Sequence, residues 1–341
     1  MSFRRTLVVA ALVPVLIAAS CSGDKKKPAA ASSSSAAPPT TAVPAPSFPL
    51  TGLPLPTGVA PRPALSVKID NVDSALPQSG LNNADIVYEE LVEGGQSRLF
   101  VTFHSQDSDP VGPIRSARPV DADLLAQLGG GVFAYSGAAP GEIAPVEDHS
   151  GATLLSNDNG VPAFYREPSK SAPHNVFAST AALYTAGTDA GAPATSPPPQ
   201  FKYGAATGAP VNNVHMVLGQ RATAGWHWNA TAGVYERDQN EAPDVLNDGA
   251  RVSAADVLIM TVKIVGTGVF DVLGEEDPLP VVIGDNPCWL LRDGQMIEGH
   301  WSRPAVNKPT IFTDLKGKEL RFHPGRTWVE LLPDSSQPAF S

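Results

Sequence analysis

The stretch DIVYEELVEGGQSRLFVTFHS, residues 85–105, decides how the first half of the chain folds. It contains two runs rich in β-branched and aromatic residues, separated by Gly94 and Gly95. Two such runs around a short glycine turn predict a β-hairpin or two closely paired strands. Immediately before it, ALSVKIDN, residues 64–71, alternates apolar and polar residues and stops at Asp70. This segment predicts a further strand that leads into a turn.

A helix signal follows the hairpin in VGPIRSARPVDADLLAQLGGG, residues 111–131. Pro119 suits the first turn of a helix, because its missing N–H would be unpaired there in any case. Asp121 and Asp123 suit the positive end of the helix dipole, and the closing glycines suit the exit. We therefore expect a short, well-capped helix in this segment.

The first half continues with a strand and a second helix. VFAYSGA, residues 132–138, predicts a buried strand, and FASTAALYTAG, residues 177–187, predicts a short helix capped by Ser179 or Thr180. The order of strand, hairpin, helix, strand and helix is typical of an α+β (or α/β) layer domain.

The second half of the sequence is mostly β. GWHWNATAGVYERD, residues 225–238, predicts two strands around a turn, and PCWLLRDGQMIEGHWSR, residues 287–303, predicts a hairpin with Asp293 and Gly294 at its turn. Proline, glycine and alanine dominate residues 187–210, which favours a domain boundary there. We expect an N-terminal α/β domain over residues 59–190, a linker over 191–210, and a smaller, mainly β C-terminal domain over 211–335.

The N-terminus has the pattern of a bacterial lipoprotein signal. Arg4 and Arg5 precede the apolar run LVVAALVPVLIAA, which is too short to cross a bilayer, since a spanning helix needs about 20 apolar residues. AASC, ending at Cys21, resembles a lipobox, although Ala18 stands where leucine is usual. We expect a signal peptide over residues 1–20 and lipidation of Cys21 by acyl chains.

Composition limits the other classes of function. Residues 21–58, rich in Lys, Ala, Ser and Pro, predict a lipidated, disordered tether. Only Cys288 then remains, so no intramolecular disulfide and no CxxC site can form. The net charge of −10, without a basic stripe, argues against nucleic-acid binding. The glycine-rich segment after residue 128 lacks a P-loop lysine and the dinucleotide spacing, so we expect no cofactor.

Several long motifs are similar to those of a known family: KIDN, ALPQSGLNNADIVYEELVEGGQSRLFVTFHSQD, VGPIRSARPVDADLL, APHNVF, GVYERD, GHWSR and GRTWVELLP. They resemble the YerB-like lipoproteins, a family of unknown function in Gram-positive envelopes, over almost all of residues 62–333. The resemblance implies an N-terminal family domain and a smaller C-terminal domain outside the membrane. It brings no established enzymatic activity, and its link to cell-wall synthesis is a hypothesis.

Arg115, Ser116 and Arg118 are candidates for an anion site, since they lie where a loop meets a helix. Backbone N–H groups at a helix start and guanidinium forks together suit a phosphate or a carboxylate. The alternative is a structural network in which the two arginines form local ion pairs with Asp121 and Asp123. The sequence leaves both interpretations open.

Five side chains are candidates for acid–base chemistry: Asp70, Asp85, Glu89, His104 and His174. In a strand, Asp85 and Glu89 share a face, and paired carboxylates could act as acid and base or bind a cation. The alternative is a solvated strand face. Because HExxH, HxH and cysteine partners are missing, we expect no metal site. No Ser, His and Asp order can be assigned, and Ser136 does not lie in a G-x-S-x-G elbow, so serine hydrolysis is disfavoured.

The second half also contains aromatic residues that could stack on sugar rings or simply form its core: Trp226, Trp228, Tyr235, Trp289, Trp301 and Trp328. In the WHW segment, the two tryptophans share one strand face and His227 points to the other.

Three functions fit these observations. The first is a lipid-anchored binding or regulatory module at the extracytoplasmic face of the cell membrane, which docks a cell-wall synthesis protein or a glycan. The second is a hydrolase or transferase acting on an envelope polymer, and the third is a purely structural lipoprotein. The lack of a recognised catalytic motif favours a role other than catalysis. A pocket that gathers Arg115, Arg118 and His174 with one of the carboxylates would instead favour the enzyme.

Overall fold

The computed structural model describes residues 45–270 and 274–341. Contacts group Ala45–Ser341 into one compact unit. The expected signal peptide, Cys21 and the first part of the expected tether lie outside the described residues. Within the described ranges, no helix is long and apolar enough to cross a membrane.

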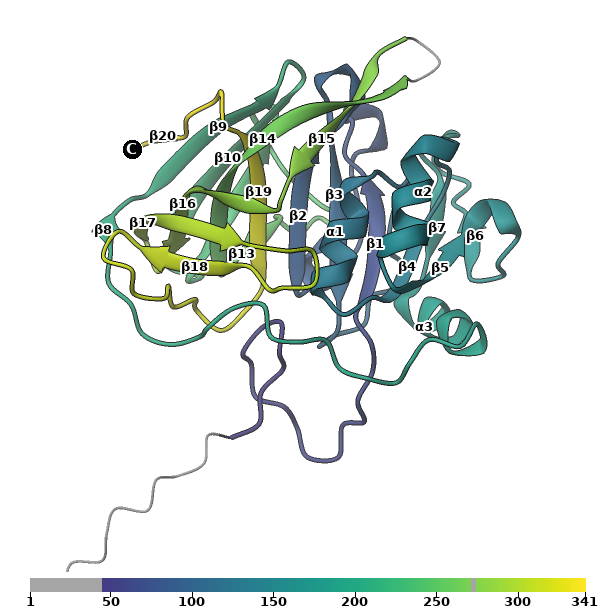
Figure 1. Cartoon of the computed structure of the whole chain (residues 1–341), viewed down its shortest axis with the longest axis horizontal. Coiled ribbons are helices and arrows are strands. Elements are labelled where there is room, and N and C mark those ends of the chain that lie inside the picture. The colour runs from purple at the N-terminus through teal and green to yellow at the C-terminus, as the bar shows by residue number, and fades with distance from the viewer. Residues whose placement is uncertain (1–44, 271–273) are drawn as a thin grey trace, which may run out of the picture. The chain divides into compact units, whose positions relative to one another are not determined.

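A large mixed sheet forms the centre of this unit (Figure 1). Its main path runs in the order β18-β17-β16-β14-β19-β2-β3-β1-β4-β5, with β15 paired to β14 and β8 paired to β17. The strands are β1 Leu65–Asp70, β2 Ile86–Leu91, β3 Ser97–Phe103, β4 Gly131–Tyr135, β5 Ala152–Ser156, β8 Ala209–Pro210, β14 Asp256–Phe270, β15 Glu276–Val281, β16 Gly284–Arg292, β17 Gln295–Arg303, β18 Ile311–Asp314 and β19 Thr327–Pro333. The predicted hairpin is confirmed, because β2 and β3 pair antiparallel.

The two halves of the sequence meet inside this sheet. Strand β19, from the end of the chain, runs parallel to both β14 and β2, so that Trp328 lies opposite Val257 on one side and Val87 on the other. The halves are therefore joined by backbone hydrogen bonds as well as by side-chain packing.

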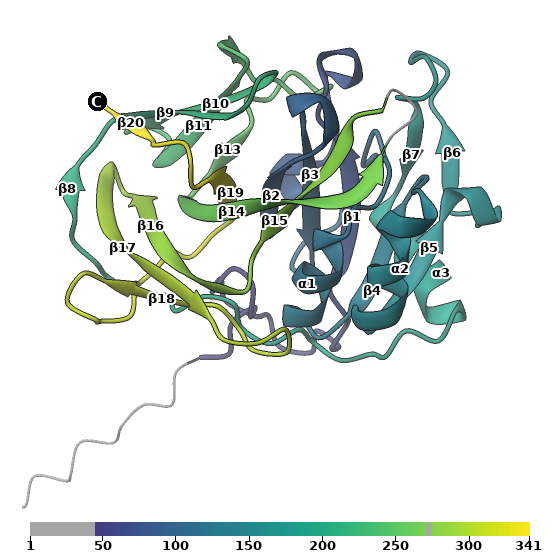
Figure 2. The ribbon, with the colours of Figure 1, turned by 45° about the horizontal axis from the view of Figure 1, so that its top comes forward.

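A second sheet packs beside the first (Figure 2). Its strands are β9 Asn213–Gly219, β10 Ala222–Asn229, β11 Val234–Gln239, β12 Ala242–Pro243, β13 Ser253–Ala254 and β20 Ala339–Phe340, and a small separate hairpin is formed by β6 Phe164–Arg166 and β7 Val176–Ala178. The expected turn between β10 and β11 and the hairpin of β16 and β17 at Asp293 and Gly294 are both present.

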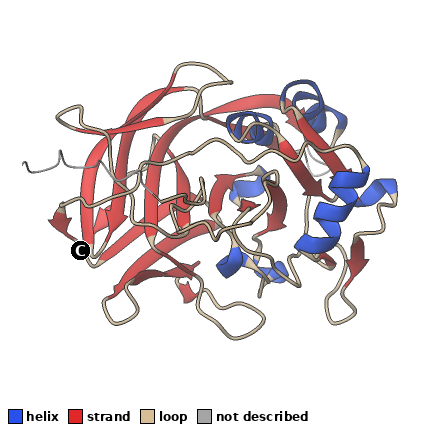
Figure 3. Cartoon of the chain, turned by 90° about the horizontal axis from the view of Figure 1, so that it is seen from below, coloured by secondary structure: helices blue, strands red, loops and turns tan. Residues whose placement is uncertain are grey.

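Three α-helices occur among the described residues, gathered at one side of the unit (Figure 3). They are α1 Val120–Gln127, α2 Pro140–His149 and α3 Thr180–Asp189. Both predicted helices are confirmed: Pro119 directly precedes α1, and Ser179 caps α3 by accepting the N–H of Ala182 at 3.2 Å. Helix α2 is not predicted from the sequence, because its apolar period is weak and Pro145 interrupts it.

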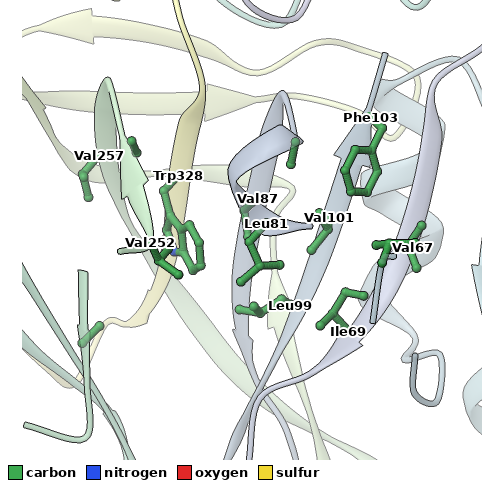
Figure 4. Close-up of a cluster of buried hydrophobic side chains, with 14 of the residues drawn as sticks. Val67, Ile69, Leu81, Val87, Leu99, Val101, Phe103, Val252, Val257 and Trp328 are labelled. Atoms are coloured by element: carbon green, nitrogen blue, oxygen red, sulfur yellow. The ribbon is translucent and has the colours of Figure 1, made fainter. Parts of the chain in front are cut away.

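Each face of the large sheet is covered by a hydrophobic core. On one face, Val67, Leu99 and Val101 belong to the core that also contains Trp328 (Figure 4) and the buried Trp226 of β10. The residues of the opposite face pack against α1, and two of the other tryptophans are also buried in the cores. The tryptophans thus serve mainly as core residues, and Trp228 remains half-buried.

The expected fold class is only partly correct. All α-helices of the described residues lie in the N-terminal part and the C-terminal part is β-rich, but the described chain as a whole is mostly strand. The expected linker 191–210 is packed, because Phe201 stacks on Phe322 with ring centroids 4.3 Å apart. The expected tether, residues 21–58, also extends too far into the globular unit, because Leu50 is fully buried.

Candidate functional site

A polar cavity of about 810 Å³ opens where turns from the two sheets meet. The β2–β3 turn contributes Glu93 and Gly94, and the β9–β10 turn contributes Arg221. The backbone N–H of Arg221 donates to the carbonyl of Gly95 at 2.9 Å, which ties the two turns together. The cavity is therefore built jointly by the first and second halves of the sequence.

Asp70 lies at one wall of the cavity, at the end of β1. Its Oδ2 atom is 2.7 Å from Nδ1 of His174 and 3.2 Å from Nε of Arg115. Arg115 is brought here because its backbone N–H donates to the carbonyl of Lys68 in β1, at 2.9 Å. Three residues that the sequence singled out, from three separate segments, thus meet at the cavity wall, with Arg115 and His174 both contacting the carboxylate of Asp70.

Ser74 extends this cluster. It lies in η1, a short 3₁₀ turn over Asp73–Ala75, and its Oγ is 3.0 Å from Nε2 of His174. Sequence analysis did not select Ser74, because it is separated from its partner histidine by 100 residues. Its position four residues after the aspartate that ends a strand is the only local signal. Arg98 and Arg221, which also line the cavity, were likewise missed.

Arg118 does not reach the cavity lining. Its guanidinium is buried and contacts Glu93, Glu142 at 3.3 Å and Asp277 at 3.3 Å. Its backbone N–H donates to Asp121 at 2.7 Å. The structural interpretation therefore holds for Arg118, but its ion pairs go to residues of other elements, not to the neighbouring aspartates.

Ser116, the third residue of the expected anion site, is half-buried and lies outside the cavity lining. Its carbonyl accepts a long hydrogen bond of 3.4 Å from Nη1 of Arg98. Only Arg115 of the three predicted anion ligands therefore faces the cavity.

The buried ion network changes the pKa values of its acids in opposite directions. Burial alone would raise the pKa of Glu93, but the charges of Arg98 and Arg118 outweigh it and hold this pKa at about 2. Burial raises the pKa of Asp277 to about 7, although Arg118 lowers it. The network thus contains one strongly acidic carboxyl and one that titrates near neutrality.

Glu89 lies between the two sheets and not in the cavity. Its Oε2 is 2.5 Å from Nη2 of Arg237, whose Nη1 is 2.5 Å from Asp244. Glu90, its neighbour, points to the opposite face and contacts Lys68. The alternative of a solvated strand face is wrong here, because both carboxylates are buried.

Asp85 and His104 lie at the far end of the sheet from the cavity. In the β1–β3 ladder, Asp70 pairs with Arg98 and Leu65 pairs with Phe103, next to His104. At about 3.3 Å per residue, the two ends are about 16 Å apart. These two candidates therefore cannot act together with His174.

Local contacts account for the positions of Asp85 and His104. Asp85 accepts hydrogen bonds from the Ser105 backbone N–H at 2.8 Å and from its hydroxyl, and burial raises the pKa of Asp85 to about 6. Burial also lowers the pKa of His104 to about 4, with the Arg62 charge adding to the effect. The ring of His104 packs edge-on against Phe48. Both side chains support the fold at this end.

No group of three or more His, Cys, Asp or Glu side chains among the described residues is arranged to hold a metal ion. Cys288 is buried in β16, and burial raises the pKa of its thiol to about 12. A thiol that stays protonated and is closed off from solvent is a packing residue, not a nucleophile.

The fold and the cavity define a β-rich protein with a polar, ligand-sized cavity where its two sheets meet. The chain belongs to the family described as "Protein of unknown function (DUF3048)": its N-terminal domain matches residues 50–193 and its C-terminal domain matches residues 214–329. The resemblance to the YerB-like lipoproteins that the motifs indicated is thereby confirmed.

One relative is the Bacillus subtilis (strain 168) protein named "Putative lipoprotein YerB". It is 28% identical over 304 residues, which span 86% of this chain and 88% of the relative. The crystal structure of YerB from Bacillus subtilis has the same fold, with a TM-score of 0.74 and 26% identity, and the match covers 86% of this chain and 99% of that chain.

Proposed function

We propose that this chain is a lipid-anchored binding module at the outer face of the cell membrane, and that its cavity holds a polar ligand of the cell envelope. The observation that carries the proposal is the cavity of about 810 Å³, which is large enough for a small glycan or peptide fragment. The lipobox at Cys21 and the name of the Bacillus subtilis relative support the anchor.

The lining favours a ligand that carries an acidic group together with hydroxyl or amino groups. Arg98 and Arg115 reach the cavity but are paired with Glu93 and Asp70. Arg221 is exposed and forms no ion pair within the described part of the chain, so it is the arginine best able to bind a carboxylate or a phosphate. Envelope glycopeptides combine carboxylates with many hydroxyl groups.

A glycan ligand is favoured over the other expected partner, a cell-wall synthesis protein. The cavity is concave and polar, whereas the large hydrophobic side chains exposed among the described residues come from separate elements, such as Tyr165 in β6, Val217 in β9 and Ile311 in β18. A docking surface for a protein would gather such side chains into one patch.

Calorimetric titration of the full chain in detergent with soluble muropeptides, which are amino-sugar disaccharides bearing an acidic peptide, tests this proposal. We expect Arg221→Ala to weaken binding by about 10-fold or more, because a charge-assisted hydrogen bond contributes roughly 1.5–3 kcal/mol. Arg321→Ala is the control, since the side chain of Arg321 is 39% exposed and lies outside the cavity lining. Absence of binding to the wild type, or equal binding by all three proteins, would refute the proposal.

A further inference from the structure

Ser74, His174 and Asp70 form an ordered chain of hydrogen bonds at the wall of the cavity. The Ser74 hydroxyl is 3.0 Å from Nε2 of His174, and Nδ1 of the same ring is 2.7 Å from the Asp70 carboxylate. An ionised carboxylate can only accept, so Nδ1 carries the ring proton and Nε2 accepts the hydrogen bond from the serine. This is the arrangement of a nucleophile, a general base and a group that orients the base.

We propose that Ser74 is an acyl-accepting nucleophile, and that the chain hydrolyses short-acyl esters of hydrophilic molecules in this cavity. The proposal rests on the proposed function in using the same cavity, and adds a reaction to it.

The exposure of the three side chains follows their proposed roles. Asp70 is 1% exposed and the side chain of His174 is 19% exposed, whereas Ser74 is open to solvent. The carboxylate is thus shielded where it fixes the imidazole, and the hydroxyl is accessible where a substrate would arrive. If the hydrogen bond between Ser74 and His174 were an incidental surface contact, there would be no reason for a buried carboxylate to hold the other side of the histidine ring.

Contacts on either side hold the serine in place. The 3₁₀ turn that carries Ser74 is fixed by Lys170, whose Nζ donates to the carbonyl of Ala75 at 2.9 Å. It is also fixed by Asn240 of the second sheet region, whose side chain donates to Asp73 at 2.8 Å. The nucleophile is therefore positioned by both halves of the protein, as a preorganised site requires.

Arg115 supplies a group that could stabilise the negative oxygen formed during acyl transfer. It contacts Asp70 through Nε, and its other guanidinium N–H groups make no hydrogen bond within the described part of the chain. Because Arg115 also lines the cavity, these N–H groups can donate hydrogen bonds to a substrate oxygen.

The cavity lining indicates the class of substrate. Apart from Gly94, its apolar lining residues are only Val72 and Ala222. A long fatty acyl chain would find few apolar side chains there, whereas a short acyl group on a sugar or another polyol would keep its hydroxyls hydrogen-bonded. An O-acetylated carbohydrate has this chemistry.

The reaction balances with water as the only co-reactant. The Ser74 oxygen attacks the ester carbonyl carbon while its proton passes to Nε2 of His174. The bond to the leaving alcohol then breaks, and the alcohol oxygen takes that proton. Water attacks the acyl-serine, gives its proton to His174, and the acid leaves as the serine oxygen regains a proton.

A fluorophosphonate probe and the model ester p-nitrophenyl acetate test the inference on the full chain in detergent. We expect the probe to bond covalently to Ser74, as located by peptide mass, with loss of fluoride. Ser74→Ala and His174→Gln should lower ester turnover by about 100-fold or more, as loss of a nucleophile or general base does. Ser302→Ala, which changes an exposed serine outside the cavity, should behave as wild type.

Asp70 is a positioning residue, so Asp70→Asn should lower kcat much more than it changes KM. An unlabelled wild type, or a probe that still labels Ser74→Ala to the same extent, would overturn the inference. If the wild type still binds muropeptides in an Arg221-dependent manner but is not labelled, only the inference fails. If Ser74 is labelled but no muropeptide binds, only the proposed ligand class fails.

Discussion

At the scale of single residues, the guanidinium of Arg118 neutralises carboxylates from three separate elements. Glu93 follows β2, Glu142 lies in α2 and Asp277 lies in β15, and all three contact this one buried cation. Charges removed from water in this way are stable only while each has its partner. The same logic applies to Lys68, which is fully buried in β1 between Glu90 and Asp121.

We therefore expect Arg118→Ala to lower the free energy of unfolding by about 3–5 kcal/mol, because it leaves Glu142 and Asp277 without their buried cation and Glu93 with Arg98 alone. Arg321→Ala, which removes a partly exposed pair of 3.9 Å with Glu319, should change it by less than about 0.5 kcal/mol. Urea unfolding at pH 7 measures both. A loss below about 1 kcal/mol for Arg118→Ala would contradict the structural role.

At the scale of elements, strand β15 places an ionisable group over the start of α1. Asp277 is buried, and within the described residues neither of its carboxylate oxygens accepts a hydrogen bond. Its contact is the ion pair with Arg118. Because the folded pKa of about 7 lies above the ordinary value of 3.8, the folded state binds this proton more tightly than the unfolded state does.

The contribution of Asp277 to stability is therefore fully present below pH 4 and is lost as the pH rises through 7. Asp277→Asn removes this titration. Relative to wild type, we expect the variant to be more stable at pH 8 than at pH 5, by on the order of 1 kcal/mol or more, since one pKa unit is about 1.4 kcal/mol. Denaturant unfolding at both pH values measures the difference, and Asp334→Asn, at an exposed position, should show none.

At the scale of the whole molecule, segments from both ends of the described chain complete the core. Leu50 is fully buried although it lies in a proline-rich region, and β19, close to the C-terminus, forms the bridge between the two halves of the large sheet. The globular unit therefore begins before residue 58, where the composition alone would place the end of a tether.

Leu50→Ala should lower the free energy of unfolding by about 2–5 kcal/mol, the usual cost of truncating a buried leucine. Val59→Ala should have an effect below about 0.5 kcal/mol, because Val59 is exposed. Thermal and urea unfolding of the two variants make the comparison. Equal stability of both would show that the segment before residue 58 does not contribute to the core.

The sequence by itself determined the local elements of this protein. The β2–β3 hairpin, α1 after Pro119, α3 after Ser179 and the hairpin at Asp293 were all predictable, because turn residues and helix caps act over a few positions. It also determined the family, since long motifs are specific even where the function is not known.

Only the tertiary structure decided which charged side chains are buried and which distant residues meet. The alternation of residues in β1 and β2 indicated that one face of each strand is polar. The sheet is covered on both sides, however. Lys68, Glu89 and Glu90 are therefore buried and take part in ion pairs. Asp70, Ser74 and His174 meet only because β1 and the segment before β7 are brought together over about a hundred residues. No short-range pattern records such a pairing, since it depends on which strands become neighbours in the sheet.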